Sequence, residues 1–301
     1  MRTDLRKRPR PGKPRTMRMR PALRALAMAA GAGLAALAQA CADRVPTAEQ
    51  IEEENRTSRV AQLMRMANTT RRGGDLRSAV ALYHRAIELA PESARPLAAL
   101  GETTLALGAY GQAAAAFRKS VDLDPANGEA RRNFGNALLA LDRPRPAAEQ
   151  FKAAIALDPT DHRAHNGFGI ARDLLGEHEA AQQHYKTAMK FAPSTLKLRN
   201  NLALSLALAG DFDEAARILR EVTADPLATV RNRQNLALVY GLAGQPAKAA
   251  KIARMDLDEA EVRNNLAYYE TLRALNGHAK AAAVLRRQGT GAPAPADTGN
   301  P

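Results

Sequence analysis

The chain has 301 residues and a formal net charge of +13, with one cysteine and no tryptophan. A single cysteine excludes an internal disulfide. Residues 1–40 hold ten of the 44 Lys and Arg but one of the 31 Asp and Glu, which leaves 34 basic and 30 acidic residues, or +4, from position 41 onward. Because this remainder is small and no basic cluster interleaves with aromatic residues, we expect no nucleic-acid binding.

Residues 1–40 have the pattern of an export signal. Their basic stretch is followed by an uncharged apolar run of 14 residues, Ala25 to Ala38, and then by small residues. A basic region, a short apolar region and a small-residue cleavage site are typical of a signal that is removed on maturation. The run is short for a bilayer span, which needs about 20 residues. An inner-membrane anchor that is retained is the alternative.

Cys41 stands directly after this signal, in a setting that resembles a bacterial lipobox. Ala40 fits the position before the cysteine, whereas the usual leucine three places before it is Ala38, with Leu37 one place early. The resemblance implies lipidation of Cys41. Because Ala42 rather than aspartate follows, it also implies sorting to the periplasmic face of the outer membrane. An ordinary signal-peptidase cut, which would leave a soluble periplasmic protein, is the alternative.

Residues 41–58 are polar and acidic, and we interpret them as a tether that leads into the first helix. Beyond them a 34-residue period begins. Prolines repeat at that spacing, aromatic residues stand eight places before them, and alanines stand four places before the aromatics; these are Pro91, Pro125, Pro159 and Pro193, then Tyr83, Phe117, Phe151 and Tyr185, then Ala79, Ala113, Ala147 and Ala181. This period and pattern are the signature of the tetratricopeptide repeat, a helix–turn–helix unit.

Each repeated residue type has a packing role. With the proline as position 32, repeats begin at residues 60, 94, 128 and 162, and position 8 is Gly101, Gly135 and Gly169. Glycine inside a helix is unfavourable, so it indicates close packing. Gly108, Asp142 and Gly176 mark turns between the helices of a pair.

The sequence therefore predicts an all-α fold, a right-handed superhelical solenoid of about seven tetratricopeptide helix pairs over residues 59–287. Within it, residues 264–287 are expected to form a seventh helix pair. Residues 288–301 have no apolar periodicity, and we expect a disordered tail.

The chain offers little catalytic chemistry. His162 and His165 stand three apart beside Asp161, a spacing that could contribute metal ligands. The carboxylate would lie in the first helical turn and point elsewhere, so we predict no metal site. No hydrolase, phosphate-loop or zinc-protease motif is present in the sequence. We expect no cofactor and no enzymatic activity.

A binding surface is the remaining candidate site. At 100° per residue, positions 2, 5, 6, 9 and 13 of each first helix lie opposite its packing positions and should line the concave groove. Those positions are rich in amides and cations, which suit a peptide backbone and acidic groups respectively. The predicted groove residues are Arg95, Arg132, Asn133, Asn136, Arg163, Asn166, Lys197, Asn200, Asn201, Arg231, Gln234, Asn235, Asn264 and Asn265. The convex face or an edge of the stack is the alternative.

The late segment RQNLALVYGLAGQPAKAAKIARMDL (233–257), together with NNLAYYETLR (264–273), resembles the TadD proteins of tight-adherence (Flp) pilus systems. That family consists of repeat-containing lipoproteins that help the pilus secretin reach or assemble in the outer membrane. The resemblance implies a non-enzymatic assembly factor whose partner is the secretin or another pilus component. An outer-membrane lipoprotein adaptor for peptidoglycan hydrolases or for envelope assembly machinery is the alternative.

Overall fold

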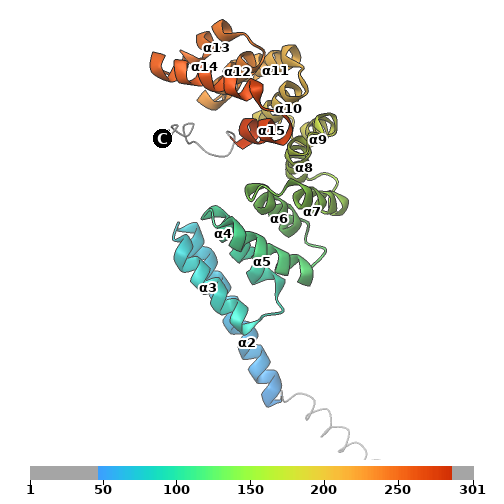
Figure 1. Cartoon of the computed structure of the whole chain (residues 1–301). Coiled ribbons are helices and arrows are strands. Elements are labelled where there is room, and N and C mark those ends of the chain that lie inside the picture. Colours follow the sequence, from blue (N-terminus) through green and yellow to red (C-terminus); the bar gives the residue numbers. More distant parts are fainter. Residues whose placement is uncertain (1–46, 287–301) are drawn as a thin grey trace, which may run out of the picture. The chain divides into compact units, whose positions relative to one another are not determined.

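The computed structural model describes residues 47–286, and within that range the chain forms 14 α-helices and no strand (Figure 1). The predicted export signal, Cys41 and the predicted tail lie outside the described residues. The first helices of the pairs are α2 (Ala48–Arg72), α4 (Ala94–Ala106), α6 (Gly128–Ala140), α8 (His162–Leu174), α10 (Leu196–Ala209), α12 (Val230–Leu242) and α14 (Glu259–Ala274). The second helices are α3 (Leu76–Leu89), α5 (Tyr110–Leu123), α7 (Pro144–Leu157), α9 (His178–Phe191), α11 (Phe212–Ala224), α13 (Pro246–Ala253) and α15 (Gly277–Arg286).

Helix α2 begins earlier than predicted. The tether was expected to reach residue 58, but the helix starts at Ala48, and Thr47 and Gln50 exchange hydrogen bonds at its beginning. All side chains from position 47 to 58 are exposed, so this stretch is helical without burying an apolar face. Residues 1–58 and 59–301 form separate units, and the packing described below belongs to the second. No helix in the described part of the chain is long and apolar enough to cross a bilayer.

In the second unit each helix packs against its partner and against the next pair. The first helices also contact one another in sequence, α4 with α6, α6 with α8, α8 with α10, α10 with α12 and α12 with α14. Second helices of successive pairs make no comparable contacts. The stack therefore curves toward the first helices, whose row we call the inner face.

The close approaches predicted at position 8 are confirmed. A Cβ atom added to Gly135 would lie 2.8 Å from the ring of Phe151, and the same holds for Gly101 against Phe117 at 2.7 Å. Phe151 is fully buried, and it also faces Gly167 of the following pair. One aromatic ring thus packs against two repeats, and glycine is needed on both sides of it.

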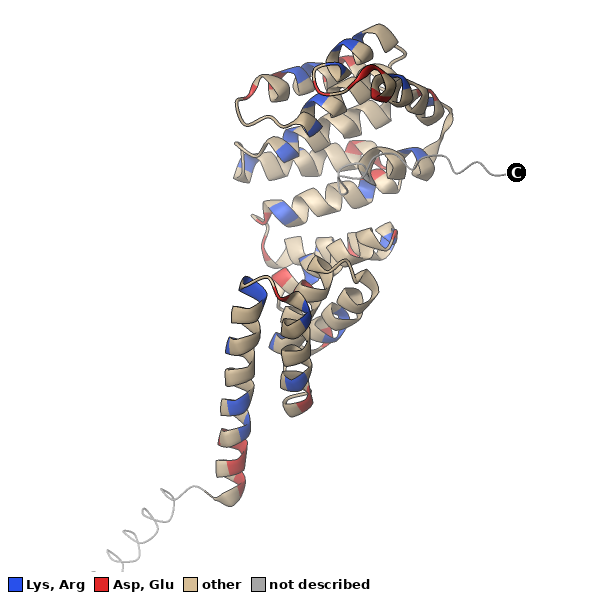
Figure 2. Cartoon of the chain, turned by 90° about the vertical axis from the view of Figure 1, so that its left-hand side faces the viewer, with Lys and Arg blue, Asp and Glu red and all other residues tan. Residues whose placement is uncertain are grey.

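The turns between paired helices are found at the predicted positions. Gly108, Asp142 and Gly176 all have positive φ, and Asp142, at 58°, is the only non-glycine residue among those described that does. In the view of Figure 2, Lys and Arg are interspersed with Asp and Glu along the described helices and form no continuous basic stripe there.

The last helix departs from the prediction. Helix α15 was expected to complete a seventh pair with α14, but it packs against α8 and α10 as well (Figure 1). The ring of His278 lies 2.9 Å from the carbonyl oxygen of Leu174, a residue 104 positions earlier. Six helix pairs and α14 therefore form the stack, and α15 folds back onto its inner face.

A candidate peptide-binding groove on the inner face

The predicted groove residues lie on the first helices, as the register requires, but they differ in exposure. Six are exposed: Arg95, Asn136, Arg163, Lys197, Arg231 and Asn264. Five are half-buried: Arg132, Asn133, Asn166, Gln234 and Asn265. Three are buried: Asn200, Asn201 and Asn235.

Cations at position 2 make up four of the six exposed members of the set. Arg95, Arg163, Lys197 and Arg231 occupy this position in the second, fourth, fifth and sixth pairs, and all four side chains are exposed. In the third pair the same position is Glu129. The inner face therefore presents cations at the start of its helices, interrupted once by an acid.

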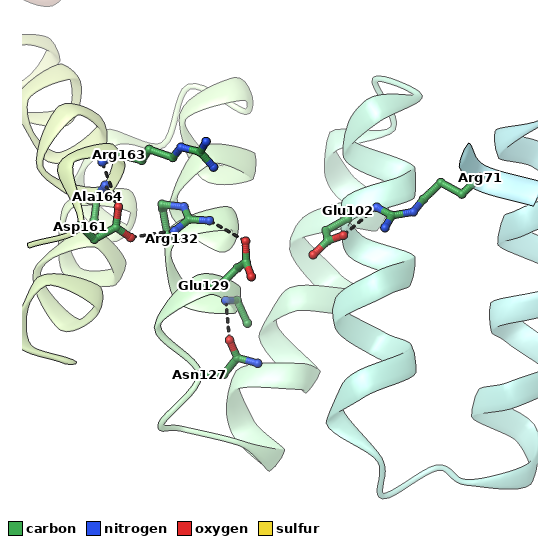
Figure 3. Close-up of polar contacts among 9 residues, drawn as sticks. Arg71, Glu102, Asn127, Glu129, Arg132, Asp161, Arg163 and Ala164 are labelled. Atoms are coloured by element: carbon green, nitrogen blue, oxygen red, sulfur yellow. Dashed lines mark hydrogen bonds and ion pairs between the residues drawn. The ribbon is translucent and has the colours of Figure 1, made fainter. Parts of the chain in front are cut away.

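Arg132 is committed to a contact between repeats (Figure 3). Its guanidinium donates to Oδ2 of Asp161, at the start of α8, and to Oε1 of Glu129 on its own helix, both at 2.7 Å. The side chain is 13% exposed. The side chain of Arg163 extends past the Arg132 guanidinium (Figure 3). Arg132 was expected to bind the partner directly; it instead joins α6 to α8.

Asp161, the acceptor of this contact between α6 and α8, also caps α8. Its Oδ1 accepts from the backbone N–H groups of Arg163 at 2.9 Å and Ala164 at 3.0 Å, which caps α8. Burial would raise the pKa of Asp161, but the hydrogen bonds from Arg132 and from these backbone groups outweigh it, so the pKa is lowered. Arg71 and Glu102, 2.7 Å apart, join α2 to α4 in a similar way (Figure 3).

The asparagines form a ladder between repeats. Asn201 donates to Oδ1 of Asn166 at 2.7 Å, and Asn235 donates to Oδ1 of Asn200 at 2.8 Å. In both pairs, position 5 of one repeat accepts from position 6 of the next. Asn201 and Asn235 were expected to hold the backbone of a bound peptide; their buried amides instead bond the first helices to one another.

The inner face also has an apolar part that the prediction missed. Positions 9 and 13 are Glu102 and Ala106 in the second pair, and Asn136 and Ala140 in the third. In the fourth and fifth pairs they are Ile170 and Leu174, then Leu204 and Leu208, which share a hydrophobic cluster with α15. Positions 9 and 13 change from polar or small residues to isoleucine and leucine in the sequence itself, so the apolar part of the inner face could have been predicted from the register.

A buried carboxylate lies where three helices of the stack meet. Asp173 is fully buried in α8 and accepts from the hydroxyls of Tyr185 at 2.9 Å and Ser205 at 2.7 Å, on α9 and α10. The ring of His178 lies 2.8 Å from it. Burial raises the pKa of Asp173 despite these hydrogen bonds. This carboxylate ties three helices together.

His165, one of the two histidines considered as metal ligands, has other contacts. His165 faces His184, with their Nδ1 atoms 3.1 Å apart, and its Nε2 lies 3.1 Å from the carbonyl oxygen of Pro159. Asp161 points to Arg132 and the start of α8 instead. Residues 47–286 contain no group of three or more His, Cys, Asp or Glu side chains placed to hold a metal ion.

Solved structures with the same fold include a tetratricopeptide-repeat protein from Parabacteroides merdae. It is 16% identical, covers 78% of this chain and 94% of its own, and superposes with a TM-score of 0.63. The type IV pilus biogenesis factor PilW is 22% identical over 71% of this chain and 97% of its own, with a TM-score of 0.59. The pilF protein of Pseudomonas aeruginosa is 16% identical over 71% of this chain and 99% of its own, with a TM-score of 0.57.

No curated protein matches the chain at a significant level. Two family models described as tetratricopeptide repeat do match it, one over residues 104–167 and the other over residues 64–128 and 175–229. These matches cover the helix pairs whose glycine–aromatic packing is described above. The chain belongs to the tetratricopeptide-repeat family.

Proposed function

We propose that this protein is a non-enzymatic scaffold of the cell envelope that binds a segment of a partner protein on its inner face. The observation that supports this most is the set of exposed position-2 cations, Arg95, Arg163 and Lys197. The repeat fold itself is one that binds proteins and peptides. The polar part of the inner face, from α4 to the start of α10, is the proposed site.

The charges of this surface define the kind of segment that fits it. Cations donate charge-assisted hydrogen bonds to carboxylates, which are roughly twice as strong as neutral ones. Glu129 and Glu102 are paired with arginines of the stack, so they add little repulsion. We therefore infer an extended segment that carries acidic side chains, or a C-terminal carboxylate, toward the beginnings of the first helices.

The partner we propose is the secretin of a Flp (Tad) pilus, whose assembly this protein would support. Three features of the sequence favour this: the export-signal pattern, Cys41 directly after it, and the resemblance of residues 233–273 to TadD proteins. PilW and pilF share the fold of the chain. The pilus assignment rests on the sequence features rather than on that likeness of fold.

Charge reversal at position 2 tests the site. We expect the amount of secretin that co-purifies from detergent-solubilised outer membranes to be at least tenfold lower with the triple variant Arg95→Glu, Arg163→Glu, Lys197→Glu than with the wild type. In cells, secretin multimers and surface pili should decline with it. All three side chains are exposed and none belongs to the packing positions, so thermal unfolding should change little.

A matched variant exists on the second helices. Arg118, Lys152 and Lys186 are exposed cations that share position 25 of successive repeats. Their reversal changes the net charge equally and should leave secretin recovery intact. Equal losses from the two triples would place the contact elsewhere, and normal secretin multimers in a strain lacking the whole gene would remove the assembly role.

A further inference from the structure

Helix α15 covers a surface that the stack does not need it to cover. In a stack of repeats, the terminal element shields the last hydrophobic face and exposes a polar one. Helix α14 already does this, because Val262, Tyr269 and Leu272 are buried while Arg263 and Glu270 are exposed. Helix α15 contacts α14 and also packs against α8 and α10, the first helices of the fourth and fifth pairs.

The covered surface is apolar at positions that should face solvent. Leu174 and Leu204 are buried, at 6% and 0% exposure, and Ile170 and Leu208 pack against the same cluster. All four belong to or pack against a hydrophobic cluster that also holds Ala281, Val284 and Leu285 of α15, so loss of α15 should expose apolar surface on the inner face. Exposed apolar patches on soluble proteins mark interaction sites.

The bound helix shows what this surface accepts. One face of α15 consists of the buried residues Ala281, Ala282, Val284 and Leu285. Near its beginning, the ring of His278 lies 2.9 Å from the carbonyl oxygen of Leu174, and its Nε2 lies 3.3 Å from Oδ1 of Asp142. The surface thus combines shallow apolar positions, suited to small side chains, with acceptor groups at one end.

We propose that the inner face of α8 and α10 is a binding site for an amphipathic helix of a partner protein, and that α15 occupies it until the partner's helix replaces it. The partner's helix would carry alanine, valine or leucine on one face and a hydrogen-bond donor near its N-terminus, toward Asp142 and Leu174. This site is apolar and separate from the polar cation surface, and it does not depend on the secretin being the partner.

Three features make the exchange feasible. Helix α15 has ten residues, and helices this short are marginal in water without tertiary contacts. Its buried side chains are small, so its hold on the stack is limited. Only Leu275 and Asn276 separate it from α14, which keeps the displaced helix near the surface as a competitor.

A labelled peptide of residues 276–286 tests the proposal against the full-length chain. The double variant Val284→Asp, Leu285→Asp should release α15 and bind this peptide at least tenfold more tightly than the wild type does. Ala279→Asp, at an exposed position of the same helix, should behave as the wild type. A peptide carrying the two aspartates should not bind any of these proteins.

Circular dichroism and hydrogen exchange decide between the remaining outcomes. The double variant should keep the helicity of the repeats, and excess peptide should speed amide exchange in residues 277–286 of the wild type. Loss of the repeat helices in the double variant would show that α15 is an integral part of the stack and would overturn the proposal. A folded double variant that fails to bind the peptide would also overturn it. Concentration-dependent dimers that exchange α15 would assign the site to a second copy of the chain instead of a partner.

Discussion

At the scale of single residues, the His165–His184 pair is a hydrogen bond that requires at least one neutral ring, because two ring nitrogens that both carry a proton cannot bond to each other. The Nε2 of His165 faces a carbonyl acceptor on Pro159, so it carries the proton, and Nδ1 of His165 must then accept from His184. The His184 ring also packs on Phe168, with their centroids 4.4 Å apart. Burial lowers the pKa of His184 to about 4, and repulsion from His165, when that ring is charged, and from Arg172 contributes.

This pair predicts a pH dependence of stability with a definite sign. In the unfolded chain a histidine binds its proton near pH 6.5, whereas folded His184 resists protonation down to about pH 4. The unfolded state therefore binds more protons between these values, so the stabilising effect is complete above pH 6.5 and is lost as the pH falls toward 4. The free energy of unfolding, measured with urea at several pH values, should show this decline. In the His184→Phe variant, the free energy of unfolding should change less between pH 6.5 and 5. Equal slopes in the two proteins would contradict the assignment.

At the scale of the helix pair, the packing of an aromatic ring against glycine decides whether two helices can meet. Gly135 and Ala147 belong to the two helices of the third pair, and both are buried around Phe151. A Cβ atom at Gly135 would lie 2.8 Å from the aromatic ring, closer than such contacts allow. Any larger side chain here must push the ring or the helix aside.

We therefore expect Gly135→Leu and Ala147→Leu each to destabilise the stack, by about 1–3 kcal/mol for the overpacking alone. Gly111→Leu is the matched control, because Gly111 lies in a helix with open space around it. Since a repeat array need not unfold in two states, helical circular dichroism in denaturant should be combined with protease sensitivity. Protease resistance equal to that of the wild type in either core variant would show that the packing register is wrong.

At the scale of the whole molecule, the proposed attachment to a membrane would depend on residues before the first described helix. The lone Cys41 follows an apolar run of 14 residues, and the structured repeats begin only beyond it. If the cysteine is lipidated, a single polar stretch and the exposed start of α2 separate the repeats from the bilayer surface.

Cys41→Ser should therefore release the protein from the membrane into the soluble periplasmic fraction. The wild type should incorporate radiolabelled palmitate, and the variant should not. Equal incorporation by both proteins would remove the lipoprotein assignment. A variant that stays in the inner membrane would favour the retained anchor instead.

The sequence predicted the fold because its signals are local. Gly135 and Phe151 are in the same repeat, and their spacing recurs, so the register of every first helix followed from a few residues. The binding role of the groove stays a prediction, and the contacts that several of its residues make between repeats could not be predicted. Nothing in one repeat shows that Arg132 meets Asp161 of the next, or that Asn201 meets Asn166.

The position of α15 was beyond such reasoning for a different reason. The apolar face of α15 indicates that the helix is buried. Its alanine and valine side chains do not identify the helix against which it packs. The apolar residues at Ile170 and Leu204 were visible in the register, so the two halves of the contact could have been found separately. Their pairing requires three-dimensional contacts across about a hundred residues of sequence.

The docking of α15 has a consequence for how the chain folds. Repeat arrays fold through contacts between neighbours, so their contact order is low and any repeat can nucleate the rest. Helix α15 adds a long-range closure, from His278 back to Leu174. The surface that α15 covers is built by α8 and α10, so these helices must fold before α15 can dock. Until then the molecule carries an open apolar surface, and the two-residue link from α14 holds α15 close to it.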